Sequence, residues 1–155
     1  MAASDDPLLA LDNQLCFALY AAYRAVAGRY RSHLAALGLT YPQYLVMLVL
    51  WEHAREGRVT RVSDLGERLR LDSGTLTPLL KRLTAQGLIR KQRAADDERV
   101  VQVFLTDAGA ALKARARQVP ARLLCDLPVS PEQVARLRQQ LRSLLAAMDQ
   151  AVPNG

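Results

Sequence analysis

The chain has 155 residues, half of them hydrophobic, and this length suits a single domain. The apolar fraction is too high for a disordered segment, and no run approaches the roughly 18 uninterrupted apolar residues of a membrane span. The start, Met1-Ala-Ala-Ser-Asp-Asp6, lacks the basic head and apolar core of a secretory signal, so we expect a cytoplasmic protein without a membrane partner. Two cysteines, Cys16 and Cys125, are too few for a disulfide framework, and without a CxxC pair we expect neither metal nor cofactor.

Positive charge is concentrated in the middle of the chain. The formal net charge is +6, and the segment from Arg55 to Arg93 holds ten basic residues against four acidic ones. A basic segment inside a folded domain favours a polyanion partner, because neutralising phosphates releases counterions. A solvated surface with an incidental bias explains the charge alone equally well.

The first half of the sequence predicts two helices. Asp6-Pro7 resembles an N-cap followed by a first-turn proline, and it would open one long amphipathic helix to about Leu37. The residues that carry its apolar periodicity are Leu11, Leu15, Leu19, Ala22 and Val26. Thr40-Tyr-Pro-Gln43 is a capping box, which predicts a buried second helix through Leu50.

The second half predicts a short helix capped by Ser63, a break at 71–74 and a helix to Gln86 with Gly87 beyond it. Alternating segments at 88–93 and 100–105 predict two strands of a hairpin. Thr106 caps a further helix that Pro120 interrupts, and Ser130 opens the last helix. That helix is expected to bury Val134, Leu137, Leu141, Leu144, Leu145 and Met148.

This order of elements predicts a mainly α fold with a small β-hairpin wing (α+β), a winged helix-turn-helix. We expect a single domain over 1–155. Within it, residues 40–106 would form a DNA-binding lobe, and the outer helices, about 8–38 and 107–150, would form the dimerisation region of a homodimer.

One face of the helix after residue 73 has the chemistry of a groove reader. Its opposite face carries the core stripe Leu76, Leu79, Leu80 and Leu83. Small residues permit close approach to a groove, threonines contact thymine methyls or phosphates, and cations reach guanine edges. The residues expected in the major groove are Thr75, Thr77, Pro78, Lys81 and Arg82. Ser73 would contact a phosphate or cap the helix. Pro78 lies on the exposed face and lowers the stability of the helix. Its presence there favours either a functional role or a kink that the packing tolerates.

The predicted hairpin places Arg93 before its turn and Arg99 after it. An arginine at a wing tip can enter a narrow minor groove, where the negative potential is enhanced. Asp97 can pair with Arg99 across the turn, and such a carboxylate could orient the arginine for DNA or simply close the turn.

Cys16 shares a helical face with Tyr20, Tyr23 and Tyr30, and all five tyrosines of the chain lie between residues 20 and 44. The thiolate is the form that reacts with peroxide. On the predicted helix, Cys16 lies too far from the helix start for that terminus to stabilise a thiolate, so phenol donors would have to do so. A small buried hydrophobe is the competing interpretation of this cysteine.

Several motifs together resemble the MarR family of winged-helix transcription regulators, over about Leu11 to Met148. They are Asp72-Ser-Gly-Thr-Leu-Thr-Pro-Leu-Leu-Lys-Arg-Leu83, Gly87-Leu-Ile89, Asp97-Glu-Arg99 and Leu105-Thr-Asp-Ala-Gly109. The resemblance implies a homodimer that binds a pseudo-palindromic operator in double-stranded DNA. It implies no enzymatic activity, and the sequence holds neither a phosphate-binding glycine loop nor a nucleophile elbow.

Leu15-Cys16-Phe-Ala-Leu-Tyr20, with Tyr30, Tyr41 and Ser73-Gly-Thr-Leu-Thr-Pro78, resembles the organic hydroperoxide resistance repressor (OhrR) branch. That resemblance implies that organic hydroperoxide oxidises Cys16 to a sulfenic acid, and that Tyr30 and Tyr41 donate hydrogen bonds to its sulfur, with Tyr20 nearby. In two-cysteine members a late thiol of the partner subunit forms a disulfide with this cysteine, and Cys125 lies at the matching place. The alternative is a MarR-type regulator released by a phenolic or aromatic small ligand, with both thiols inert.

Overall fold

The computed structural model describes residues 6–151. Residues 1–5, which carry most of the argument against a secretory signal, lie outside this range. The chain divides into two compact units, residues 1–119 and 120–155. Among the described residues, no helix combines the length and hydropathy needed to cross a membrane.

The first long helix begins later than the sequence predicts. Asp6 closes a turn, since its Oδ1 accepts a hydrogen bond from the Leu8 N–H at 3.0 Å. A 3-10 turn, η1 (Leu11–Asn13), follows, and α1 (Leu15–Ala35) starts only after Gln14 in extended conformation. The Gln14 side-chain amide donates to the carbonyls of Leu8 and Ala10 at 2.8 and 2.9 Å. Because these bonds hold the preceding turn in place, the expectation of a helix from Asp6 is wrong for the residues before Leu15.

The second helix, α2 (Tyr41–Arg55), has the predicted start and a longer run than predicted. The Thr40 N–H donates to Gln43 Oε1 at 2.9 Å, and the Gln43 N–H donates to Thr40 Oγ1 at 3.4 Å, so the capping box is confirmed. The helix forms the centre of the core of the first unit, with Met47, Leu50 and Trp51 buried.

The helix-turn-helix consists of α3 (Val62–Leu69) and α4 (Ser73–Ala85). Both N-caps lie one or two residues before the predicted Ser63 and Ser73. Asp64 Oδ2 accepts from the Arg61 N–H at 2.8 Å at the start of α3. Asp72 Oδ1 accepts from the Thr75 N–H at 2.8 Å at the start of α4. A carboxylate accepts a hydrogen bond and also favours the positive helix end, so neither serine is needed as a cap.

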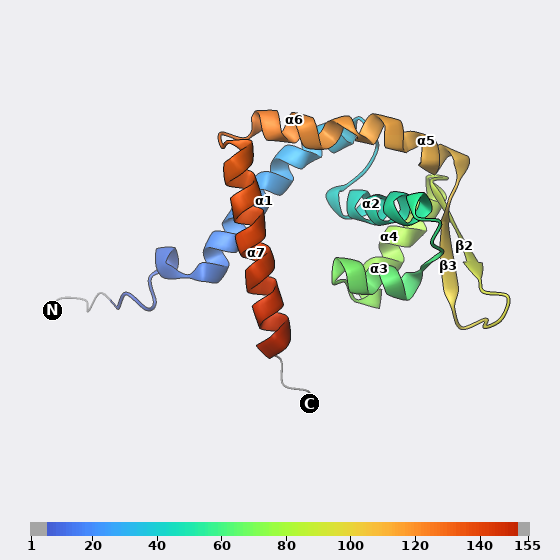
Figure 1. The fold of residues 1–155 in the computed structure, drawn as a ribbon, viewed down its shortest axis with the longest axis horizontal. Helices are drawn as coiled ribbons and strands as arrows, with labels where there is room; N and C mark the ends of the chain where they lie inside the picture. The colour runs from blue at the N-terminus through green and yellow to red at the C-terminus, as the bar shows by residue number, and fades with distance from the viewer. Residues whose placement is uncertain (1–5, 152–155) are drawn as a thin grey trace. The chain divides into compact units, whose positions relative to one another are not determined.

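The wing is a hairpin of β2 (Ile89–Arg93) and β3 (Val101–Leu105), as predicted, and Figure 1 shows it extending beyond the helices of its unit. Ile89 pairs with Leu105, and Arg93 pairs with Val101. A short strand, β1 (Thr60–Arg61), adds to β3 and gives the antiparallel order β1-β3-β2. Two residues are too few to show an alternating pattern, which is why the sequence did not predict β1.

After the wing, α5 (Asp107–Ala116) begins as predicted, since Thr106 Oγ1 accepts from the Gly109 N–H at 3.1 Å. The helix turns at Arg117 and continues as α6 (Gln118–Asp126). Pro120 explains this interruption, because it has no N–H to donate to the carbonyl of Ala116. The buried Trp51 indole donates to the Gly109 carbonyl at 2.9 Å and fastens α5 to α2.

The second unit contains the last helix, α7 (Pro131–Ala151). Its capping box is confirmed: the Ser130 N–H donates to Gln133 Oε1 at 2.8 Å, and the Gln133 N–H donates to Ser130 Oγ at 3.1 Å. The expectation that α7 buries its apolar stripe is wrong for the single chain, because no residue of α7 is buried. Leu137 and Met148 keep 55% and 59% of their surface exposed. The stripe has the predicted spacing, and the second unit by itself does not bury it.

Candidate nucleic-acid interface and thiol site

The outward face of α4 is polar, cationic and accessible. Its predicted core stripe is buried, with Leu76 and Leu80 each 2% exposed and Leu83 fully enclosed. The predicted groove-facing residues are all exposed, as is Ser73 at the helix start: Thr75, Thr77, Pro78, Lys81 and Arg82. Within residues 6–151, no acidic side chain forms an ion pair with Lys81 or Arg82. This face therefore presents two cations that are available to an anionic partner.

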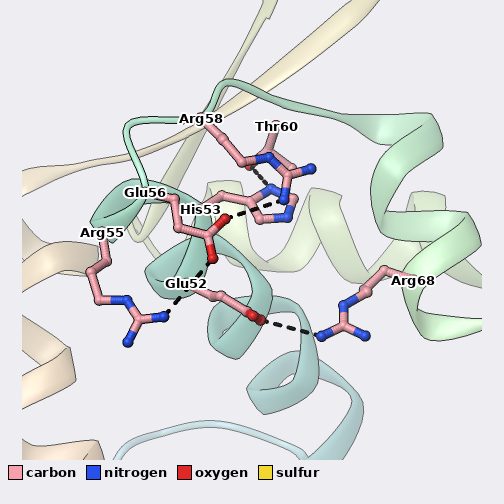
Figure 2. Close-up of polar contacts among 7 residues, drawn as sticks. All are labelled: Glu52, His53, Arg55, Glu56, Arg58, Thr60 and Arg68. Atoms are coloured by element: carbon pink, nitrogen blue, oxygen red, sulfur yellow. Dashed lines mark hydrogen bonds and ion pairs between the residues drawn. The ribbon is translucent and has the colours of Figure 1, made fainter.

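Other arginines of the basic segment have their charge matched within the chain. Figure 2 shows Glu56 between Arg55 and Arg58, at 3.9 and 3.2 Å, and Glu52 of α2 at 3.5 Å from Arg68 of α3. Beside them, the buried His53 Nδ1 lies 2.8 Å from Thr60 Oγ1. Exposed pairs of this kind contribute little stability, about 0–1 kcal/mol each. These pairs affect the distribution of charge. The positive charge of the segment 55–93 that has no paired carboxylate lies on α4 and the wing more than on α2.

The wing turn is held by its own side chains. Arg93 Nη1 donates to the Glu98 carbonyl at 2.7 Å. Asp97 Oδ1 accepts from the Arg99 N–H at 3.0 Å and from Arg99 Nε at 3.1 Å. These bonds from Arg99 lower the pKa of the Asp97 carboxyl. The pairing that the sequence left open is thus present, and the Arg99 side chain is still 91% exposed.

Cys16 is the second residue of α1 and is exposed. This corrects the expectation that it lies far from a helix start. Tyr20 lies one turn further along α1, and its hydroxyl accepts from Arg24 Nη1 at 3.2 Å.

The other tyrosines lie in the middle and later part of α1 and at the start of α2. The Tyr41 ring centroid lies 4.9 Å from that of Tyr30 and 6.2 Å from that of Tyr23, and the Tyr30 and Tyr44 centroids are 6.0 Å apart. Burial raises the pKa of Tyr30 and Tyr41, and burial followed by the two neighbouring phenols raises the pKa of Tyr44 to about 12. At neutral pH these side chains are therefore phenols that can donate a hydrogen bond.

The structure does not bring Cys16 to Tyr30 and Tyr41 within one chain. Cys16 and Tyr30 belong to the same continuous helix. Tyr30 lies fourteen positions after Cys16, which corresponds to about 21 Å at a rise of about 1.5 Å per residue. Cys125, also exposed, lies near the end of α6, in the second unit.

Two contacts beyond the sequence prediction tie the loop before α2 to the helix-turn-helix and to α5. Gln86, at the end of α4, donates through Nε2 to the Gly38 carbonyl at 2.8 Å. Arg115 of α5 donates through Nη2 to the Ala36 carbonyl. Their acceptors are backbone carbonyls, which carry no sequence signal.

Comparison with known proteins identifies relatives with this arrangement. The family model described as "Transcriptional regulator SarA/Rot" matches residues 30–116. The organic hydroperoxide resistance transcriptional regulator of Bacillus subtilis is 46% identical over 140 residues, which cover 90% of this chain and 92% of that protein. The chain belongs to the MarR/SarA-type family of transcription regulators. This confirms the winged-helix fold and the OhrR-like resemblance that the sequence motifs indicated.

Solved structures of the family include several states of one member, AbfR of Staphylococcus epidermidis. Reduced AbfR bound to DNA is 32% identical to this chain with a TM-score of 0.72, and the match covers 89% of this chain and 94% of that one. Disulfide-formed AbfR is 35% identical with a TM-score of 0.62, covering 87% and 92%. The relatives found for this MarR/SarA-type chain are transcription regulators rather than enzymes.

Within residues 6–151 of this family member, no group of three His, Cys, Asp or Glu side chains is placed to hold a metal ion.

Proposed function

We propose that the protein is a homodimeric repressor that binds operator DNA and is released when organic hydroperoxide oxidises Cys16. The observation that carries the proposal is the exposed Cys16 in the first turn of α1, in a chain that is 46% identical to an organic hydroperoxide resistance transcriptional regulator. A thiol at one end of a helix and phenol donors at the other can meet only if a second copy packs head to tail along α1. The similarity to an organic hydroperoxide resistance transcriptional regulator supports organic hydroperoxide as the oxidant.

In this dimer, Tyr30 and Tyr41 of the partner subunit donate hydrogen bonds to the Cys16 thiolate, and Tyr20 lies beside it. Burial raises the pKa of both phenols, so they stay protonated at neutral pH and each keeps a hydrogen to donate. The terminal helices, about 8–38 and 107–150, form the dimerisation region. The exposed apolar side chains of α1 and α7, among them Leu15, Leu137 and Met148, support this assignment.

The redox step starts with attack of the Cys16 thiolate on the terminal oxygen of the hydroperoxide. The O–O bond breaks, the terminal oxygen stays on the sulfur with its hydrogen as a sulfenic acid, and the leaving alkoxide takes up the proton that the Cys16 thiol released, so an alcohol leaves. The thiol of Cys125 of the partner subunit then attacks the sulfenic sulfur, and a disulfide forms as water leaves. The Cα atoms of such a pair must come within about 7 Å. Any helix shift this requires would move the two recognition helices off the spacing of about 34 Å between successive major grooves.

DNA binding rests on α4 and the wing. Lys81 and Arg82 reach base edges or phosphates of the major groove, with Thr75, Thr77 and Pro78 allowing close approach, and Ser73 contacts a phosphate. Arg99 enters the minor groove, oriented by Asp97, and Arg93 holds the wing turn. The free cations of α4 support this assignment.

The redox proposal is tested on an operator first selected from a random DNA pool. Cys16→Ser should bind the operator like the wild type and remain bound after treatment with cumene hydroperoxide. Cys125→Ser should still form a sulfenic acid at Cys16 but no intersubunit disulfide on a non-reducing gel. If Cys16→Ser is released by oxidant, the redox assignment is wrong; release by a phenolic ligand alone would favour a regulator with inert thiols.

The interface proposal is tested with Lys81→Ala against Arg55→Ala, which removes the same charge from a residue already paired with Glu56. Lys81→Ala should weaken operator binding and reduce the slope of log affinity against log salt by about one. Arg55→Ala should leave both close to the wild-type values. Equal effects of the two substitutions would contradict the assignment of α4 to the groove.

A further inference from the structure

A cleft opens between the end of α2 and the edge of β3. Gly57 has a φ of +67°, and the Arg58 N–H donates to the His53 carbonyl at 2.9 Å, so the chain folds back onto the end of α2. The chain joins the sheet only at Thr60, which pairs with Val103. Among the described residues, no strand pairs with the last two residues of β3 on this side, and the cleft lies between them and the turn.

The cleft is small and mostly apolar. Its volume is about 280 Å³, below the roughly 300–1,000 Å³ usual for sites that enclose a small ligand. A volume of this size suits one apolar side chain of a larger partner. Val59, one of the lining residues, keeps 52% of its surface exposed. The other apolar side chains that line the cleft are Leu50, Ala54, Val103, Phe104 and Leu105.

The face of the sheet beside the cleft carries cations. Side chains alternate between the two faces of a strand, so Arg90 and its cross-strand partner Phe104 share the face opposite to the buried Ile89. The Arg90 Cζ atom lies 4.4 Å from the centroid of the Phe104 ring. Arg61 belongs to this face too, because it pairs with Gln102, two residues before Phe104. Two arginines and one aromatic ring thus share this face.

The sheet itself does not balance this charge. Its strands hold one cationic residue in β1 and three in β2, and the described strands contain no acidic residue. Within residues 6–151, no ion pair joins Arg61 or Arg90 to an acidic side chain. Arg58, which also lines the cleft, is paired with Glu56 at 3.2 Å (Figure 2). The charge of two arginines is therefore available to an anionic partner.

The cleft is separate from the segments that the proposed dimer and the proposed DNA interface use. Its described lining residues belong neither to the terminal helices, about 8–38 and 107–150, nor to α4 and the wing turn 93–99. Neither the second copy nor the operator is therefore assigned to this surface.

We propose that the cleft is a docking site for an extended acidic segment of another protein. The segment places one apolar side chain in the cleft and its carboxylates beside Arg90 and Arg61. Charge complementarity determines the acidic character of the partner, and the uncovered edge of β3 suits an extended backbone. The apolar lining favours a peptide over duplex DNA, because sugars and phosphates cannot fill an apolar cleft.

Peptide binding tests the proposal on the full-length protein. The probe is a fluorescein-labelled peptide with aspartate and glutamate residues on both sides of a central leucine, and fluorescence anisotropy measures its affinity. The same peptide with serine in place of leucine should bind about tenfold more weakly, because the apolar burial is lost. Failure of the leucine peptide to bind, or equal binding of the two peptides, overturns the proposal.

Two neighbouring cations of β2 provide a matched pair of variants. Arg90→Ala should weaken binding of the leucine peptide about fivefold. Lys91→Ala removes the same charge from the opposite face of the strand and should leave the affinity unchanged. Val59→Asp, at a residue that is already half exposed, places a carboxylate in the cleft and should abolish binding. Equal effects of Arg90→Ala and Lys91→Ala on the peptide overturn the proposal.

Operator DNA is the competing partner for this face. If Arg90→Ala weakens operator binding as much as Lys81→Ala does and leaves the affinity for the peptide unchanged, the face belongs to the DNA interface and the docking proposal is overturned. Unchanged operator binding by Arg90→Ala, together with the loss of peptide affinity, supports the docking site. These measurements do not involve oxidation of Cys16, so their failure leaves the proposed function standing.

Discussion

Gly109 is required by a close approach of two backbone segments. A Cβ atom added there would overlap the Leu88 carbonyl oxygen and lie 3.0 Å from its carbonyl carbon. The Gly109 carbonyl also accepts the bond from Trp51. Because backbone cannot rotate away as a side chain does, we expect Gly109→Ala to lower the free energy of unfolding by about 1–3 kcal/mol. Urea unfolding at a fixed protein concentration measures this.

The matched control for Gly109 is Gly28, which lies inside α1 with no atom within 4 Å of an added Cβ. Gly28→Ala should leave stability unchanged or raise it by up to about 1 kcal/mol, since alanine is the better helix former. Equal destabilisation by both substitutions would show that the contact with Leu88 is not the cause.

The titration of Tyr44 makes the stability of the fold depend on pH. Its pKa is raised to about 12, chiefly by burial, against an ordinary value of 10.0. A raised pKa stabilises the fold fully below pH 10, and this contribution is lost as pH rises through 12. We therefore expect the free energy of unfolding to fall between pH 10 and 12, and to fall less steeply in Tyr44→Phe.

At the scale of elements, α4 contains a proline past its first turn. Pro78 has no N–H for the Gly74 carbonyl, and a proline in a helix interior costs about 3 kcal/mol relative to alanine. Pro78→Ala should therefore raise the free energy of unfolding, by about 1–3 kcal/mol, while changing operator affinity through the altered groove-facing surface. A Pro78→Ala protein that is less stable than the wild type would show that the ring has a packing role.

The sequence predicts a helix or strand well when the contacts that set its ends join residues close together in the chain. The caps at Thr40, Thr106 and Ser130 join atoms three residues apart, so they follow from the sequence alone. The late start of α1 does not, because it depends on Gln14 folding back onto the carbonyls of Leu8 and Ala10. That difference moved Cys16 from the interior of a predicted helix to its first turn.

The candidate site also has one part that the sequence predicts and another that it does not. The outward side of α4 follows from helical periodicity, and the structure exposes Lys81 and Arg82 as expected. The distance between Cys16 and Tyr30 does not follow from residue types, because it depends on both residues lying on one unbroken helix. The contact of Gln86 with the Gly38 carbonyl joins residues 48 positions apart and leaves no pattern in the sequence.

At the scale of the whole molecule, the apolar stripe of α7 calls for a second chain. Leu145 keeps 43% of its surface exposed in the single chain. A charge placed there would be buried in the proposed dimer, so Leu145→Glu should shift the protein toward monomer in sedimentation velocity. Gln139→Glu adds the same charge to the opposite face of α7 and should leave the dimer intact. A dimer that survives Leu145→Glu would place the interface elsewhere.

The order β1-β3-β2 leaves β2 as an outer strand, with free backbone groups along one side. Such a strand can template the addition of strands from other molecules, which leads to aggregation. Three of its five residues are cationic: Arg90, Lys91 and Arg93. Mutual repulsion between these side chains on neighbouring molecules disfavours strand-to-strand addition. The cations that the proposed interface assigns to the wing thus also disfavour the addition of further strands to β2.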